Sequence, residues 1–435
     1  MTTIFVTTAK RFDIRLDNLT FGLWLVCIFS LFIPIQFYVP LFTLFIFSVA
    51  MLAILRAHFA LVRPPIVSLL LVGFTYIMWA SVSFILNRDF SVHEQYIKLV
   101  LNSSFLLASV VFFEMHRHRL SSMFSSLKRL LTLLIVLSAA QVALNVVLLN
   151  AWLWPFSGQV SNSSAAYLIV TPGVFFGGAE KNIWATKIAL VVCLYIGILW
   201  VKRNTSWTSW IVIGLGLFSV LYTFSRTAQL TTFVGLALFI FLIVLSSRQR
   251  LARYALLGAI LLLIPFILQW LAGLLRFDWS LFDLSQGTQD DGFRGRLFLW
   301  TSFLNNLSNF NFLWGNGIQY GRYYFSEVSS EIAFLGNDNF HNAFLNHLVD
   351  SGVVGLVLYA LLFVIIFARP KALSTRLLLL LPLLACISLQ YVGYDNDIMA
   401  YLAAAWLILQ VPAVSEETRN RLDNPKRRQS PIIGT

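Results

Sequence analysis

The residues best suited to chemistry lie in the segment Asn339-Phe340-His341-Asn342-Ala343-Phe344-Leu345-Asn346-His347, where a long loop enters an apolar stretch. His341 stands at that boundary. A neutral histidine has a pKa near 6.5 and can accept a proton at ordinary pH. The positive end of a helix dipole disfavours the imidazolium, so a position at a helix start favours the neutral ring. The sequence therefore predicts His341 as a general base; the alternative is a helix-start residue that faces water.

Further polar residues follow His341 at helical spacing. His347 and Asp350 lie three residues apart and can share one face of a helix. Asn342, Asn346 and Asp350 form a stripe at four-residue spacing, which is more often interhelical hydrogen bonding than catalysis. His341 and His347 are six residues apart, outside the usual spacing of zinc ligands on a helix. We keep Asn342 and His347 as secondary candidates and predict no metal site.

Three arginines are candidates for binding an anion. Arg226 lies between two apolar stretches with almost no loop, and an arginine offers a rigid fork of donors that suits phosphate oxygens. Its alternative role is an interfacial arginine that extends to lipid headgroups. Arg294 and Arg296 follow the acidic pair Asp290-Asp291, so their alternative is a local salt-bridged turn.

Two lysines are weaker candidates for the same anion. Lys187 lies about one turn inside an apolar stretch, and a charged residue at such a depth is a functional candidate by default. Lys181 precedes it on the same segment. We expect both lysines on the side of the membrane that carries His341.

The composition shows what must position these residues. Hydrophobic residues make up 58% of the 435-residue chain and charged residues 11%, with a mean hydropathy of +0.79. Soluble domains carry about 25% charged residues. Many windows reach the roughly 20 apolar residues that cross a bilayer as a helix, and they are too continuous for barrel strands. The sequence predicts an all-α polytopic membrane protein, because helices satisfy their own backbone groups in lipid.

About twelve transmembrane helices are expected, and charge gives their orientation. Of the 31 Lys and Arg residues, 22 fall in loops on one side, which the positive-inside rule makes cytoplasmic together with both termini. The net charge of +12 is thus explained by orientation and anionic lipids, and a nucleic-acid partner is not expected. The expected spans are 20–39, 41–55, 66–86, 97–113, 130–149, 183–201, 207–223, 229–245, 255–275, 342–367, 377–392 and 398–411.

The chain is expected to form a single integral membrane domain over residues 1–435. Residues 276–341 would be a large loop with short helices on the side opposite the cytoplasm, and residues 415–435 a basic cytoplasmic tail. Apolar residues recur at helical spacing over residues 296–310, so an amphipathic helix is predicted there, either on the membrane surface or as a lid on the spans. Residues 314–317, Trp-Gly-Asn-Gly, predict a tight turn.

These residues resemble a known family. His341-Asn342, followed after nine residues by Gly352 and after two more by Gly355, resembles the histidine motif of bacterial O-antigen ligases. The wider pattern is similar to the superfamily of ligases and polymerases of lipid-linked oligosaccharides, and it covers residues 181–355. Its further parts are Ser225-Arg226-Thr227 with Leu230, Arg296 with Trp300, and Gly315-Asn316-Gly317.

The resemblance implies a metal-independent membrane glycosyltransferase, active on the periplasmic face of a bacterial inner membrane, that needs no cofactor. The donor would be O-antigen on undecaprenyl pyrophosphate, and the acceptor lipid A–core oligosaccharide, in lipopolysaccharide biosynthesis. His341 would take the proton of the acceptor hydroxyl, and Arg226 and Arg296 would bind the pyrophosphate, with Arg294, Lys187 and Lys181 as weaker contributors. Attack opposite the leaving group would invert the anomeric centre.

Two alternatives stay open, and a third class is disfavoured. The nearest is an O-antigen polymerase, which performs the same chemistry on lipid-linked repeat units; Gly352 and Gly355 favour the ligase. A transporter of the lipid-linked glycan would place its charges near the bilayer midplane and show related halves, whereas the candidate residues here crowd one face. A metal-dependent membrane glycosyltransferase would carry acids in an early outer loop, and residues 36–40 have none.

Overall fold

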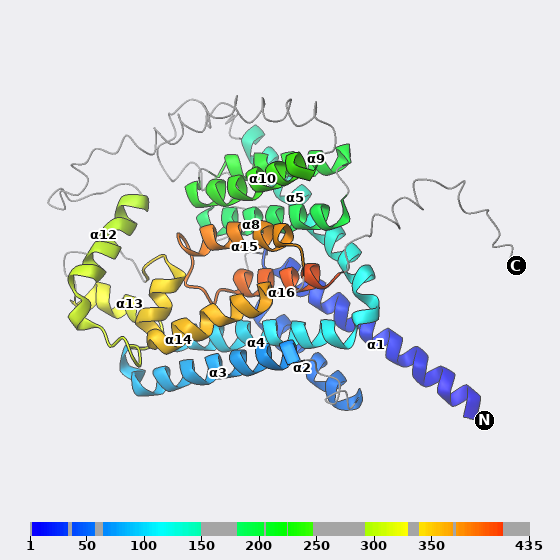
Figure 1. Ribbon diagram of the computed structural model, residues 1–435, viewed down its shortest axis with the longest axis horizontal. Coiled ribbons are helices and arrows are strands. Elements are labelled where there is room, and N and C mark those ends of the chain that lie inside the picture. Colours follow the sequence, from blue (N-terminus) through cyan, green and yellow to red (C-terminus); the bar gives the residue numbers. More distant parts are fainter. Residues whose placement is uncertain are drawn as a thin grey trace, which may run out of the picture.

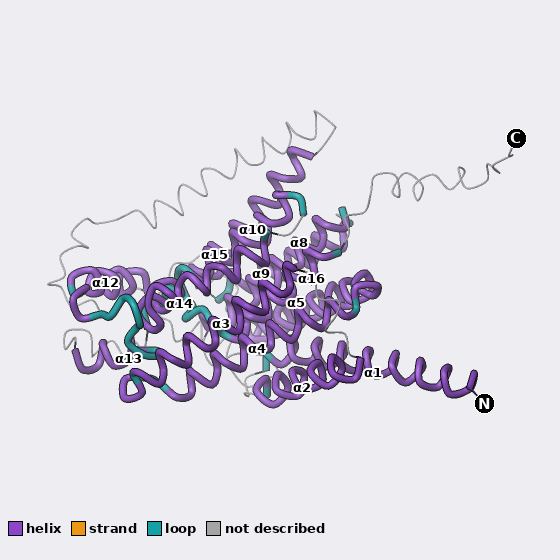
Figure 2. Tube along the Cα trace, turned by 60° about the horizontal axis from the view of Figure 1, so that its bottom comes forward, coloured by secondary structure: helices purple, strands orange, loops and turns teal. Residues whose placement is uncertain are grey.

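The computed structural model describes residues 2–33, 37–56, 64–148, 181–203, 206–223, 225–246, 292–328, 339–368 and 371–411. Throughout these ranges the regular elements are helices, as Figures 1 and 2 show. The predicted all-α fold is therefore confirmed for the described part of the chain. The long helices are α1 Thr2–Ser30, α2 Tyr38–Arg56, α3 Pro64–Leu86, α4 His93–Met115, α5 Leu120–Leu148, α8 Lys181–Lys202, α9 Trp207–Leu221, α10 Arg226–Ser246, α12 Gly292–Asn305, α14 Ala343–Phe367, α15 Leu373–Ile387 and α16 Asn396–Gln410.

Seven of these helices, α2, α3, α4, α5, α8, α10 and α14, are long and apolar enough to cross a membrane. Every expected span overlaps a helix except residues 255–275, which lie outside the described residues. The count of twelve stays a prediction. The first expected span, 20–39, differs most: α1 ends at Ser30 and α2 begins at Tyr38. Pro34 lies between them, and a proline disfavours the helical conformation of the residue before it.

Helix α8 occupies the centre of the bundle. It packs against α5, α9, α10, α15 and α16, and most of its length is buried. A helix that is apolar on every side is expected in such a place. Helix α16 is likewise buried over most of its length, and its run Ala403–Ala405 lets neighbouring backbones approach closely.

Helices α2 and α3 form an outer face. They pack on α4, and α14 packs on α3. Phe47, Met51, Leu71 and Phe74 on this face are all more than half exposed. A soluble protein rarely shows so much contiguous apolar surface, so this face is suited to lipid tails.

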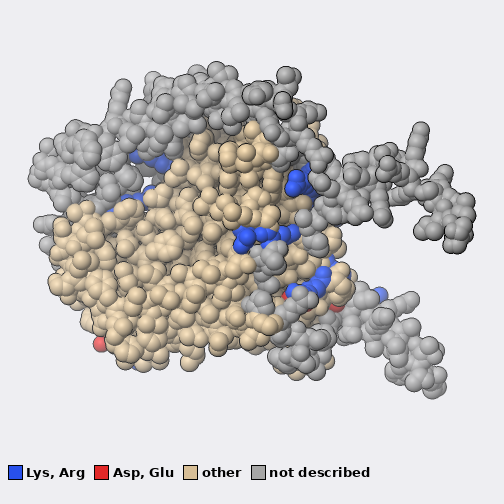
Figure 3. All heavy atoms as spheres, in the orientation of Figure 1, with Lys and Arg blue, Asp and Glu red and all other residues tan. Residues whose placement is uncertain are grey.

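Several basic side chains gather at the end of the bundle where α8 and α16 finish (Figure 3). There Lys202 Nζ donates to Ser125 Oγ at 3.2 Å, and Lys371 Nζ donates to the carbonyl of Val411. Arg119 donates to Asn18 of α1. Segments far apart in sequence thus bring their basic loops together, as the charge pattern predicts.

The opposite end carries α12, the short α13 (Tyr320–Tyr323) and the start of α14 (Figures 1 and 2). Leu299 and Phe303 of α12 pack with Phe310, Phe340 and Val349 in a second apolar cluster. The amphipathic helix predicted over 296–310 is present, beginning at Gly292 and followed by a 3-10 turn at Leu307–Asn309. It packs on the segment that carries His341, as a lid would.

The tight turn predicted at residues 314–317 packs into a kink in α14. Gly352 has φ +69°, and a Cβ there would lie 2.3 Å from the carbonyl oxygen of Leu313, so only glycine fits. The turn residues fill the opened helix: Asn316 N donates to Val349 O at 2.9 Å and Gly317 N to Asp350 O at 3.1 Å. Gly352 of the histidine motif therefore allows the turn at residues 314–317 to pack against α14.

Candidate functional site

The backbone of His341 is held in an unusual conformation. Its φ is +52°, in the left-handed region that few residues other than glycine adopt. His341 N donates to Asn339 Oδ1 at 2.7 Å, Phe340 N donates to Asn346 Oδ1 at 3.0 Å, and the Phe340 carbonyl accepts from Trp300 Nε1 at 2.9 Å. Strained positions of this kind persist only when their surroundings fix them, and they cluster at functional sites.

Asn342, a secondary candidate from the sequence, has a structural task. Its side chain caps α14 by accepting from Phe344 N at 3.0 Å and Leu345 N at 3.2 Å. Such a cap satisfies backbone donors that have no partner inside the helix. Asn342 therefore sets where α14 begins, directly after His341.

Arg296 joins three elements. Its Nη2 donates to Gln390 Oε1 at 2.7 Å, and its Nη1 donates to Thr227 Oγ1 at 3.3 Å. Arg296 lies on α12, Thr227 in the first turn of α10, and Gln390 on the segment between α15 and α16. The two acceptors fix the plane of the guanidinium at the outer end of the bundle.

His341 and Arg296 are close enough to influence each other. The pKa of His341 is lowered from 6.5 to about 4, first by burial and second by the positive charge of Arg296, whereas a hydrogen bond to the Gln390 backbone acts in the opposite direction. The ring is therefore neutral at neutral pH. In a neutral imidazole one nitrogen donates and the other accepts, so a ring that donates to Gln390 keeps an acceptor nitrogen.

Arg226 begins α10 and has an exposed side chain. Its neighbour Thr227 is the residue that accepts from Arg296, so the two candidate arginines belong to the same region. Lys181 begins α8 and Arg294 lies in the first turn of α12, but their side chains lie outside the described residues.

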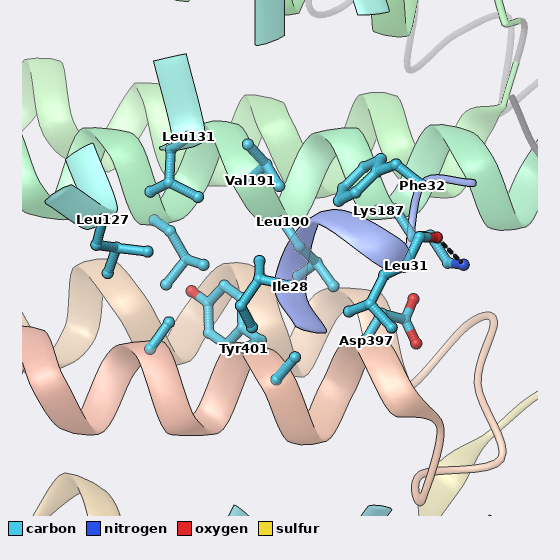
Figure 4. A pocket seen from close by; sticks show the side chains of 13 residues that line it. Ile28, Leu31, Phe32, Leu127, Leu131, Lys187, Leu190, Val191, Asp397 and Tyr401 are labelled. Atoms are coloured by element: carbon cyan, nitrogen blue, oxygen red, sulfur yellow. Dashed lines mark hydrogen bonds between the residues drawn. The ribbon is translucent and has the colours of Figure 1, made fainter. Parts of the chain in front are cut away.

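Lys187 belongs to a different environment. Its Nζ donates to the carbonyl of Leu31 at 2.8 Å, where α1 ends. Figure 4 shows it at one end of a small cavity whose walls are apolar, with the carboxylate of Asp397 beside it. Partial burial and the hydrogen bond to a backbone carbonyl give Lys187 a role in holding α8 against the end of α1.

His347 is enclosed on every side. Its Nε2 lies 2.8 Å from the hydroxyl of Tyr76 and its Nδ1 2.7 Å from the carbonyl of Ala343, and its ring stacks on Tyr359. Asp350 takes another partner, accepting at Oδ1 from Tyr320 N at 3.1 Å. The helical face that the two residues share therefore serves two separate contacts.

The sequence did not point to Gln390, and it indicated Thr227 only as a neighbour of Arg226 in the motif Ser225-Arg226-Thr227. Gln390 fell inside an expected span, 377–392, whereas α15 ends at Ile387 and leaves Gln390 on the connection to α16. The acids Asp395 and Asp397, directly after that span, were the available signal that a polar connection lies there.

The geometry combines a neutral imidazole with a fixed guanidinium. A neutral ring can accept a proton, and a guanidinium stabilises an anion beside it. Within the described ranges, no group of three or more His, Cys, Asp and Glu side chains could hold a metal ion. The arrangement is suited to proton removal next to a group that gains negative charge.

Comparison with known proteins finds a similarity to a known family over part of the chain. Residues 211–360 match the sequence model of the O-antigen ligase family. This stretch contains Arg226, Thr227, Arg296 and His341, and ends eight residues after Gly352. No curated protein matches the chain. The match supports the resemblance found in the sequence: residues 211–360 are similar to the O-antigen ligase family, and the seven long apolar helices indicate a multi-pass membrane protein.

Proposed function

We propose that the protein is an O-antigen ligase, which transfers O-antigen from undecaprenyl pyrophosphate to lipid A–core oligosaccharide with inversion at the anomeric carbon. One observation carries this proposal: the neutral His341 and the guanidinium of Arg296 meet at Gln390, so a base and an anion-binding group share one site. The family match supports the class of reaction.

Arg296 binds the pyrophosphate leaving group, and Arg226 binds it from the start of α10. Negative charge develops on the leaving oxygens as the glycosidic bond breaks, and a donor fixed in advance stabilises that charge without reorganisation. The bonds from Arg296 to Gln390 and Thr227 supply this fixation. Lys181 and Arg294 are weaker contributors; Lys187 is the weakest, because it donates to Leu31.

His341 takes the proton of the acceptor hydroxyl as the oxygen attacks the anomeric carbon. A ring with a pKa of about 4 is a weak base, so the bound donor has to assist it. The pyrophosphate brings negative charge beside Arg296, and a nearby negative charge raises the pKa of an imidazole. Binding of the donor thus raises the pKa of His341 before this residue takes the proton of the acceptor hydroxyl.

The site belongs on the periplasmic side of the inner membrane in this proposal. The described basic loops gather at the opposite end of the bundle, which the positive-inside rule assigns to the cytoplasm. Both substrates are carried by lipids, so an acceptor and a donor can meet at the outer membrane boundary where α14 begins.

The acceptor separates a ligase from a polymerase. The close packing of Gly352 against Leu313 shows that the fold itself requires this glycine, so the glycine does not distinguish a ligase from a polymerase. Purified protein is therefore given lipid-linked donor with either lipid A–core or a second lipid-linked repeat unit, and the products are identified by mass spectrometry. Transfer to lipid A–core alone supports the ligase, whereas elongation of the lipid-linked glycan shows a polymerase.

The same assay tests the remaining parts of the proposal. Transfer is expected without ATP and in excess chelator, with His341→Ala as the inactive control. Activity that disappears with chelator and returns with a divalent metal would contradict the metal-independent mechanism. A wild-type protein that transfers to neither acceptor would overturn the proposed function itself.

A further inference from the structure

Gln390 contacts both members of the proposed catalytic pair. Its side-chain oxygen accepts from Arg296 Nη2 at 2.7 Å, and its backbone carbonyl is the hydrogen-bond partner of the His341 ring. The side chain is 8% exposed, so these contacts are made in a largely dry setting. Hydrogen bonds are electrostatically stronger there than at an exposed surface.

The backbone of Gln390 is itself fixed by the end of α15. Its N donates to the carbonyl of Cys386 at 3.1 Å, so it continues the last helical turn. The segment that follows is bound just as firmly: Asp395 Oδ2 accepts from Val392 N and from Gly393 N, each at 3.0 Å. The backbone that carries both hydrogen-bond acceptors of Gln390 is therefore rigid.

Asn346 ties the two halves of the site together. Its Oδ1 accepts from Phe340 N at 3.0 Å, and its Nδ2 donates to the Tyr391 carbonyl at 3.3 Å. Phe340 precedes His341 and Tyr391 follows Gln390, so one buried amide fixes the spacing between the base and its partner.

Close packing adds a second restraint. Gly393 has φ +109°, and a Cβ at this position would lie 2.5 Å from Cε1 of His347. Its carbonyl accepts from the Tyr359 hydroxyl at 3.0 Å. The connection between α15 and α16 is thereby pressed onto α14 one turn below His341.

From these contacts we infer that Gln390 is a positioning residue that orients Arg296 through its side chain and His341 through its backbone carbonyl. The carbonyl holds one ring nitrogen as a donor, which directs the other nitrogen toward the acceptor hydroxyl. The amide oxygen holds the guanidinium without adding charge, so the anion-binding capacity of Arg296 is kept. This inference rests on the proposed glycosyl transfer and assigns a function to a residue outside the family match.

Gln390→Ala removes the bond to Arg296 and leaves the carbonyl in place. A guanidinium displaced by about 1 Å costs up to about 10²-fold in rate, so kcat/KM should fall by about 10- to 10²-fold. Gln390→Glu keeps an oxygen for Arg296. It should recover much of kcat while raising KM for the donor, because its charge repels the pyrophosphate. The new charge also favours the imidazolium, so the acid limb of the pH profile should move to higher pH.

A double-mutant cycle separates positioning from a structural role. If Gln390 acts through Arg296, then Gln390→Ala in an Arg296→Ala background should lose little further activity. Gln410→Ala is the matched control, since Gln410 is the last residue of α16, far along the helix from the site. Protein level and thermal stability are measured for every variant.

The outcomes are distinguishable from those of the proposed function. The inference is overturned if Gln390→Ala transfers like wild type while His341→Ala is inactive, or if the losses of Gln390→Ala and Arg296→Ala simply multiply. A loss in Gln390→Ala that Gln390→Glu does not restore, with an unmoved pH profile, also contradicts it. If the wild-type protein transfers to neither acceptor, the proposed function is the part that is wrong.

Discussion

His341 and His347 lie six residues apart around the start of α14, and their surroundings differ in nearly every respect. His341 precedes the helix in a left-handed conformation, beside the positive charge of Arg296. His347 lies inside the helix, where Tyr76, the Ala343 carbonyl and the Tyr359 ring occupy both nitrogens and one face. The neutral ring of His341 can accept a proton beside a guanidinium, whereas both ring nitrogens of His347 are engaged in contacts inside the fold.

The comparison shows that burial does not identify a functional histidine. Both rings are largely enclosed, but their partners differ in kind. The partners of His347 are neutral groups that any interior histidine needs. The surroundings of His341 include an arginine from another helix and a strained backbone held by four separate contacts, counting the cap of Asn342. A strained residue that several separate contacts hold in place is characteristic of a functional position.

The largest expected effect is that of His341→Ala. Transfer should fall by about 10²- to 10⁴-fold, the usual contribution of a positioned base. Folding and donor binding should persist, because only proton transfer in the transition state is lost. The measurement is O-antigen transfer in cells that lack the native enzyme, at matched protein level. Normal transfer by this variant would remove His341 from the mechanism.

Arg296 should have the next largest effect. Arg296→Ala removes the fixed donor and is expected to cost about 10²- to 10³-fold in kcat, as for other pre-organised donors to a developing anion. Arg296→Lys keeps the charge but cannot bind Gln390 and Thr227 together, so it should also be impaired. Equal activity of Arg296→Lys and wild type, measured with purified protein, would show that charge alone suffices.

The fold could be predicted from the sequence much further than the site could. Long apolar segments produce helices whatever their neighbours are, so α3, α8 and α14 appear close to their expected bounds. The site depends on which loops meet. Gln390 sits at the end of an apolar run, and only the termination of α15 at Ile387 brings it to Arg296.

His341 and Arg296 were visible in the sequence for a different reason. Each stands where a polar segment meets an apolar one, and His341 also precedes the helix cap Asn342. Lys187 was visible by the same rule, but its partner Leu31 comes from α1, and no periodicity indicates that contact. Pairing between distant segments is the information that a single sequence lacks.

A smaller effect concerns pH. Since the pKa of His341 is lowered to about 4, the ring of the free enzyme is neutral above that pH and loses its function as a base below it. The profile of kcat/KM should therefore be flat near neutrality and fall on its acid side near pH 4. In Arg296→Ala the lost positive charge raises the pKa of His341, so the acid limb should move upward. An unchanged limb would mean that the two residues are not electrostatically linked.

The smallest effect on transfer is expected for His347, and it completes the comparison. His347→Phe leaves the Tyr76 hydroxyl buried without its acceptor, which should lower the free energy of unfolding by about 1–3 kcal/mol. Activity per folded molecule should stay near wild type, because His347 contacts neither Arg296 nor Gln390 among the described interactions. Removing both partners should cost less than removing one, so Tyr76→Phe combined with His347→Phe should regain part of the lost stability. Thermal unfolding in detergent and transfer by the same samples measure the two quantities separately. A stable His347→Phe protein with transfer reduced as far as in His341→Ala would reverse the roles of the two histidines.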